Sequence, residues 1–66
     1  MKPIAFIVMK IDNQYNEMVY GTDCEFKAKA VRESLQREWE KVGNKTIHFS
    51  IIECYSMDEF HYWKDI

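Results

Sequence analysis

Four side chains in this sequence are of the kinds that ligate zinc, but their spacing does not match a zinc site. No two form a C-x-x-C pair or a helical His pair, the spacings found in common structural and catalytic sites. Nothing beside either cysteine marks a Cys-His nucleophile pair. We therefore expect no metal site, and expect both thiols to pack as small hydrophobes. The four residues are Cys24, His48, Cys54 and His61.

Paired carboxylates are the second possible source of chemistry. Four of the five best-placed acidic residues fall in the first turns of two predicted helices, where negative charge stabilises the helix dipole. The two glycines form no phosphate-binding loop, and so short a chain has little room for an enclosed site. We expect no enzyme, no catalytic residue and no cofactor. The carboxylates are Asp23, Glu25, Glu53, Asp58 and Glu59.

Aromatic and basic side chains remain as candidates for binding. Aromatic residues make up 15% of the sequence. Their flat faces can stack on the ring of a ligand, and basic side chains can bind its phosphate groups. The alternative for each aromatic residue is ordinary packing against a small core, and packing under the hairpin is what we expect for Phe26. The candidate ligand-binding residues are Tyr15, Tyr20, Arg32, His48, Tyr55, Tyr62, Trp63 and Lys64.

Three strands are predicted from apolar and β-branched runs. Residues 4–11 form the first strand, bounded by Pro3 and by the turn-forming Asp12-Asn13-Gln14. This strand is apolar on both faces, which is typical of a strand covered on both sides. Residues 15–20 form a second strand that Gly21 ends, and residues 46–55 form a third.

A long helix is predicted between the second and third strands. Thr22 and Glu25 have the spacing of a capping box, and Gly43-Asn44 is a typical helix stop. Between them one apolar stripe recurs at three- and four-residue spacing. The stripe consists of Cys24, Ala28, Val31, Leu35, Trp39 and Val42.

A short last helix over residues 57–64 is predicted because Ser56 and Glu59 repeat the capping-box spacing. The fold class is therefore α+β, with element order β-β-α-β and a short C-terminal helix. A right-handed crossover places the third strand beside the first, which gives sheet order 2-1-3. One helix covers one face of this sheet, so we expect a second copy to cover Ile7, Met9 and Ile52 on the other face.

Length and charge narrow the function classes. The 66 residues form one predicted domain, 1–66, and nine Lys and Arg residues are interspersed with eleven Asp and Glu residues. Binding to nucleic acid is disfavoured because no basic patch is present. The apolar run of residues 4–9 is too short for a signal or a membrane span. Two cysteines far apart in the sequence favour a cytoplasmic protein.

The sequence also resembles the small β-β-α-β proteins common in bacteriophage genomes, over residues 4–55. The resemblance is carried by Met9-Lys10, Tyr15-Asn16-Glu17, Tyr20-Gly21-Thr22-Asp23, Ala28, Ala30 and Ile52-Glu53-Cys54-Tyr55. It implies an anti-defence factor that acts in the host cytosol.

Two functions follow as expectations. In the first, a homodimer sequesters a nucleotide-derived immune signal, with aromatic residues stacking and Arg32, His48 or Lys64 meeting phosphates. In the second, the domain is an inhibitor that binds a host protein through its aromatic surface.

Overall fold

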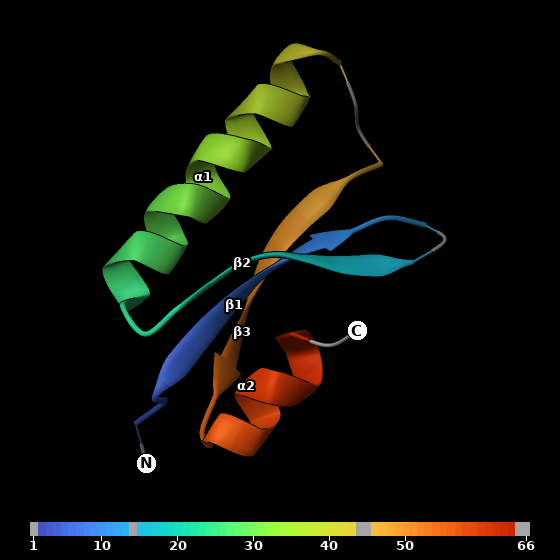
Figure 1. Ribbon diagram of the computed structural model, residues 1–66. Helices are drawn as coiled ribbons and strands as arrows, with labels where there is room; N and C mark the ends of the chain where they lie inside the picture. Colours follow the sequence, from blue (N-terminus) through green and yellow to red (C-terminus); the bar gives the residue numbers. More distant parts are fainter. Residues whose placement is uncertain (1, 14, 44–45, 65–66) are drawn as a thin grey trace.

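The computed structural model describes residues 2–13, 15–43 and 46–64, which form three strands and two helices. The order along the chain is β1, β2, α1, β3 and α2 (Figure 1). This confirms the predicted α+β class and element order. Gln14 of the predicted turn and Asn44 of the predicted helix stop lie outside the described residues. The bounds are β1 Ala5–Ile11, β2 Asn16–Thr22, α1 Glu25–Lys41, β3 His48–Cys54 and α2 Met57–Lys64.

The sheet has strand order β2-β1-β3, as predicted, and both pairings are antiparallel. The apolar β1 lies in the centre, where both of its faces can be covered. β2 runs two residues further than expected, because Gly21 and Thr22 pair with Ile7 and Phe6 instead of ending the strand. The connection from β2 through α1 to β3 therefore passes over the middle strand.

A β-bulge interrupts the pairing of β1 with β2. Val8 pairs with Tyr20 and the next residue, Met9, pairs with Met18, so that Val19 has no partner on β1. An extra residue of this kind changes which face the following side chains point to. Tyr20 accordingly packs against the cluster under α1, whereas Met18 packs on the opposite side of the sheet.

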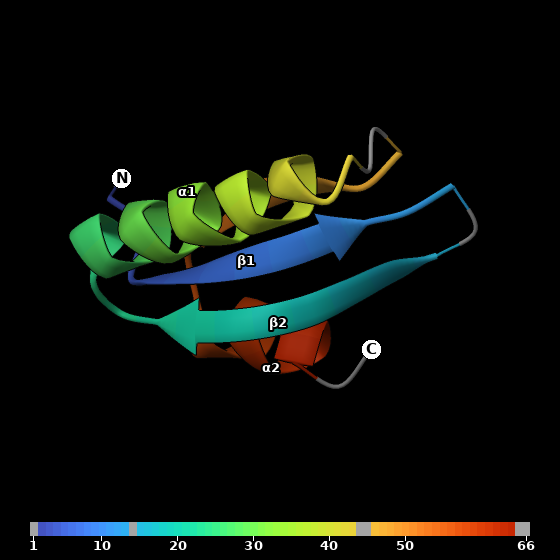
Figure 2. The same ribbon diagram turned by 90° about the horizontal axis from the view of Figure 1, so that it is seen from above.

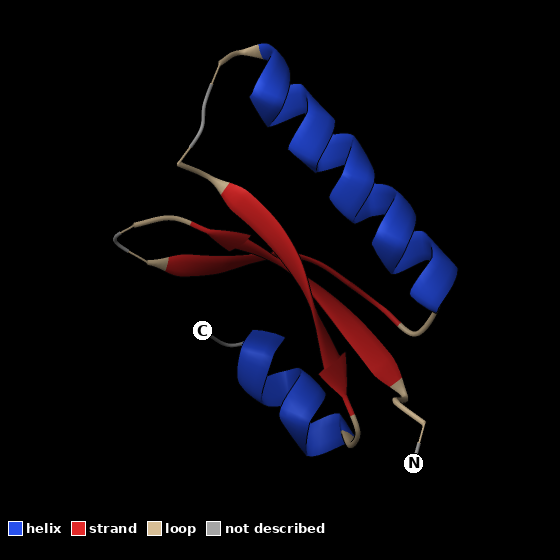
Figure 3. Cartoon of the chain, turned by 180° about the vertical axis from the view of Figure 1, so that it is seen from behind, coloured by secondary structure: helices blue, strands red, loops and turns tan. Residues whose placement is uncertain are grey.

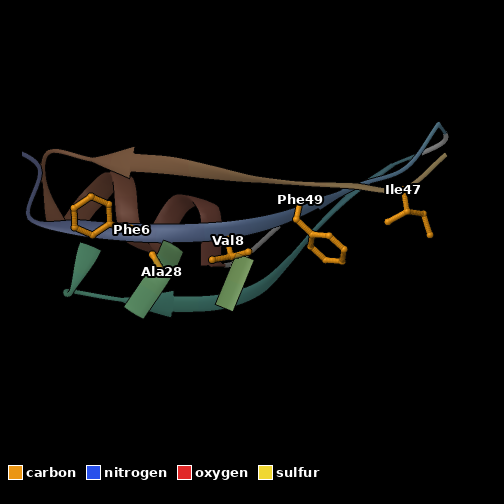
Figure 4. Close-up of a cluster of buried hydrophobic side chains, with 5 residues drawn as sticks. All are labelled: Phe6, Val8, Ala28, Ile47 and Phe49. Carbon is orange, nitrogen blue, oxygen red and sulfur yellow. The ribbon is translucent and has the colours of Figure 1, made fainter. Parts of the chain in front are cut away.

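Helix α1 covers one face of the sheet and encloses the first core cluster (Figures 1 and 4). Val31, Leu35 and Trp39 of the predicted stripe pack against this cluster. Val42 does not, and its side chain is 74% exposed because helical geometry ends at Lys41. The buried members of the cluster are Phe6, Val8, Ala28, Ile47 and Phe49.

The start of α1 differs from the prediction, whereas its end agrees. Cys24 is the N-cap residue, and its backbone N–H donates to Thr22 Oγ1 at 3.1 Å. The predicted Thr22–Glu25 capping box is therefore wrong, because Thr22 still belongs to β2. Gly43 follows the last turn with φ +79°, the left-handed conformation that glycine adopts at low cost.

Helix α2 covers the other face of the sheet, on the side opposite α1 (Figure 2). Phe60 and Trp63 pack there against Ile7 and Met9, which are almost fully buried. The expectation that this face lies open in a single chain is wrong, because α2 itself supplies the cover. Homodimerisation stays a prediction, but the apolar face no longer requires a second copy.

The start of α2 follows the predicted capping pattern in part. The Glu59 N–H donates to Ser56 Oγ at 3.2 Å, as a capping box requires, whereas Glu59 Oε2 accepts at 3.2 Å from the N–H of Tyr55, one residue before the cap. These two bonds tie the helix start to the end of β3. They set the position from which Phe60 and Trp63 reach the sheet.

Candidate functional site

The eight candidate ligand-binding residues are spread over both faces and both ends of the sheet. Asn16 and His48 both pair with Ile11, so Tyr15 and His48 lie at the hairpin end. Tyr55 follows Cys54 at the opposite end of β3. Tyr62, Trp63 and Lys64 belong to α2, whereas Tyr20 and Arg32 lie on the α1 side. A single chain does not gather these residues into one site.

Several of the candidates contribute to the fold. Tyr20 and Trp63 each pack against a core cluster. The ring of Tyr62 meets that of Trp63 edge-on with centroids 5.4 Å apart, but 65% of Tyr62 is exposed. Ordinary packing therefore describes Tyr20 and Trp63. Exposed rings remain at Tyr15, Tyr55 and Tyr62.

Arg32 holds the backbone of the neighbouring strand. Its Nε–H donates to the Phe49 carbonyl at 2.9 Å, and the Phe49 N–H donates to Gln36 Oε1 at 3.0 Å. Both backbone groups of one β3 residue are thus bonded by side chains of α1. Because these groups would otherwise be open on an edge strand, Arg32 and Gln36 protect this part of the edge from pairing.

The thiols and histidines do not form a reactive cluster. Within residues 2–13, 15–43 and 46–64, no three His, Cys, Asp or Glu side chains are grouped as a metal site requires. Both cysteines are free, and Cys54 is fully buried. Burial raises the pKa of the Cys54 thiol, and the nearby Glu59 carboxylate raises it further. Such a thiol stays protonated at neutral pH and is a poor nucleophile.

Four large apolar side chains are exposed at one end of the molecule. Phe26 is 80% exposed, so the expectation that it packs under the hairpin is wrong. Phe26 is not a member of the apolar stripe of α1, and its exposure agrees with helical spacing. Sequence patterns gave no signal for Ile4 or Met57. We refer to these four residues as the end surface: Ile4, Phe26, Tyr55 and Met57.

The topology brings the end surface together from four segments. Thr22 pairs with Phe6 and Cys54 pairs with Ala5, so β2 and β3 both finish beside the start of β1. Helices α1 and α2 begin shortly after those strands end, and Figure 3 shows both helix starts near the beginning of β1. The Ile4 N–H also donates to the Cys54 carbonyl at 2.8 Å. Each exposed side chain is therefore anchored to an ordered strand end or helix start.

The described surface includes two shallow depressions. One, of about 240 Å³, is lined by Glu38, Trp39 and Val42, and Lys10 Nζ lies 5.0 Å from the centroid of the Trp39 ring. The other, of about 190 Å³, lies between the first turns of α1 and the edge of β3. Both are open to solvent, unlike the enclosed pockets that bury most of a small ligand.

Comparison with known protein families, with curated proteins and with solved structures finds no match for this chain. In the described part of the chain, neither helix has both the length and the apolar character needed to cross a membrane.

Proposed function

We propose that this protein acts by binding another protein, and that the end surface is its contact. The observation that carries the proposal is the exposure of Ile4, Phe26, Tyr55 and Met57 at one end of the fold. Single exposed apolar residues are common on monomers, but several large ones at the same end of a small fold can form an interaction site. The resemblance to phage proteins favours a host protein as the partner.

Phe26 is the expected anchor of this contact. It lies in the first turn of α1, where the Ala28 N–H donates to the Cys24 carbonyl at 3.1 Å and Ala28 packs in the core. A large ring on an ordered helix loses little conformational freedom on binding, and such residues often supply much of the binding energy. Its burial by a partner would remove apolar area from water without any rearrangement of the fold.

Inhibition by protein binding is favoured over nucleotide capture by the placement of the candidate residues. A nucleotide needs a stacking ring and a cation within reach of one ligand. Tyr15 and His48 share one end of the sheet, but Arg32 is bonded to Phe49 and Tyr55 lies at the other end. The end surface, by contrast, is present on a single chain.

The test compares two neighbouring substitutions on the first turn of α1. Phe26→Ser removes the exposed ring, and Lys27→Ser changes a neighbour that is also exposed, as the control. Affinity capture from an extract of the host should recover one polypeptide with the wild-type and Lys27→Ser proteins. Phe26→Ser should weaken binding of that polypeptide by about tenfold or more, corresponding to about 1.4 kcal/mol. Equal recovery by all three proteins would refute the end surface as the contact.

A further inference from the structure

Part of the outer edge of β3 is open for pairing with another strand. In antiparallel pairing, successive residues direct their backbone groups alternately toward the partner strand and away from it. Phe49 directs both groups away from β1, since Arg32 and Gln36 bond them. Ile51 and Glu53 lie two and four residues further along the strand, so their backbone N–H and C=O groups also point away from β1. Among the described residues, no group bonds the outward N–H and C=O groups of these two residues.

A groove runs beside this open edge. It lies between β3 and the first turns of α1, has a volume of about 190 Å³, and is lined by Phe6, Glu25, Lys29, Ile51 and Glu53. An unpaired strand edge beside a helix is the arrangement in which some domains take up an extended peptide as an added strand. The peptide's main chain bonds the edge, and its alternate side chains enter the groove.

The groove carries an unpaired negative charge. Glu25 Oε1 lies 3.5 Å from Lys29 Nζ, so these two charges offset each other. Glu53 is exposed and has no ion-pair partner in the described part of the chain. The apolar walls formed by Phe6 and Ile51 suit the aliphatic stem of a long side chain, whose charged head would then reach the carboxylate.

We propose that β3 takes up an extended segment of the partner protein as a fourth strand along Ile51–Glu53, with a Lys or Arg side chain of that segment in the groove against Glu53. This inference rests on the proposed function, because it specifies how a protein partner is held. Residues on either side of the basic one face the α2 side of the sheet, beside Ile52, and are expected to be apolar. The segment is short, because the edge at Phe49 is already bonded by α1.

A second copy of the chain fits this edge less well. Pairing two β3 strands about Ile52 would use the open groups of Ile51 and Glu53. In that pairing Glu53 lies opposite Ile51 of the other copy, and the two Glu53 side chains are diagonal neighbours on the face that also carries Glu25 of each copy. Diagonal neighbours are within reach of long side chains, so this arrangement gathers negative charge, and each Lys29 is engaged with its own Glu25. Charge therefore favours a basic segment from a different protein.

The probe is a random library of displayed peptides of about ten residues, a length sufficient for one added strand. Peptides selected on the folded protein should share an apolar-basic-apolar pattern. Glu53→Lys should weaken their binding by about tenfold or more, corresponding to about 1.4 kcal/mol. Glu38→Lys, the same charge change on α1 away from β3, should leave the dissociation constant within about twofold. Addition of peptide should slow amide hydrogen exchange at Ile51 and Glu53, as strand pairing requires.

Several results would overturn strand addition. They are the absence of any enriched peptide, equal binding of the selected peptides to Glu53→Lys, and unchanged exchange at the two amides. A wild-type dimer in which the Ile51 and Glu53 amides are protected from exchange without any peptide would assign the edge to a second copy. Binding that Phe26→Ser abolishes and Glu53→Lys leaves intact would refute strand addition while supporting the end surface.

Discussion

Gly21→Ala tests whether α2 packs on the sheet as the fold requires. A Cβ at position 21 would lie 2.8 Å from Met18 Cε and 3.0 Å from Phe60 Cζ. The Met18 methyl group ends a flexible side chain and can move at little cost. The Phe60 ring is held against the sheet by α2, so it must shift by about half an ångström to restore ordinary contact, and overpacking of this kind costs about 1–3 kcal/mol.

The net change in the free energy of unfolding follows from two opposing effects. Replacing glycine restricts the unfolded chain and stabilises the protein by about 0.4–1 kcal/mol. Subtracting this from the overpacking cost leaves a net destabilisation between about 0 and about 2.6 kcal/mol, and about 1.3 kcal/mol from the midpoints of the two ranges. For a domain of this size, a loss of about 1.3 kcal/mol should lower the melting temperature by roughly 5–10 °C. Thermal and urea unfolding, each followed by circular dichroism, would measure both quantities.

A double-mutant cycle identifies Phe60 as the cause. Phe60→Leu removes the ring atoms nearest Gly21, so it should cost at least about 0.5 kcal/mol less in the Gly21→Ala background than in the wild type. Gly43→Ala is the control, because its φ of +79° makes Ala unfavourable although nothing lies within 4 Å. It should destabilise the protein without coupling to Phe60. Stability of Gly21→Ala equal to or above wild type would refute the packing of α2 against this glycine.

Three further outcomes are expected. Leu35→Ala should lower the free energy of unfolding by about 2 kcal/mol, because it leaves a cavity under α1. Glu33→Ala loses only an exposed ion pair with Arg37 at 3.8 Å, and should change the same quantity by less than about 0.5 kcal/mol. Urea titrations would measure both. Alkylation followed by mass spectrometry should modify Cys24 well before the buried Cys54; the reverse order would contradict the burial of Cys54. Burial raises the pKa of the Cys54 thiol in the folded state. The stability that the protonated thiol contributes is therefore complete below the pKa of the unfolded state and is lost as pH rises through the pKa of the folded state. Above about pH 9, a Cys54→Ala variant should lose less stability than the wild type.

The parts of the fold that follow local patterns could be predicted from the sequence. The doubly apolar run of β1 indicated the central strand, and the three- and four-residue spacing indicated the inward face of α1. The Ser56 cap likewise indicated where α2 begins. Each of these features depends on residues close together in the chain, which is where periodicity and capping rules apply.

Features that depend on distant residues could not be predicted in the same way. An apolar face indicates that something must cover it, but not whether Phe60 and Trp63 of the same chain or a second copy provides the cover. The bulge at Val19 depends on the pairing register between β2 and β1. The exposure of Phe26 depends on where the hairpin lies relative to α1. The candidate site was harder still to predict, because an open strand edge depends on which backbone groups Arg32 and Gln36 bond.

The placement of the candidate binding residues links the nucleotide hypothesis to the homodimer. Within one chain, Tyr15 and His48 are at the hairpin end, and Tyr55 is separated from them by the length of β3. A strand of seven residues spans about 20 Å, so no single nucleotide would contact all three. Contact of one nucleotide with all three residues would therefore require a second copy that brings Tyr55 of one chain near Tyr15 and His48 of the other. Sedimentation at micromolar concentration, with and without nucleotide released from host extract, tests both ideas at once. A species of the single chain mass under both conditions would refute a nucleotide site shared by all three residues and favour protein binding through the end surface.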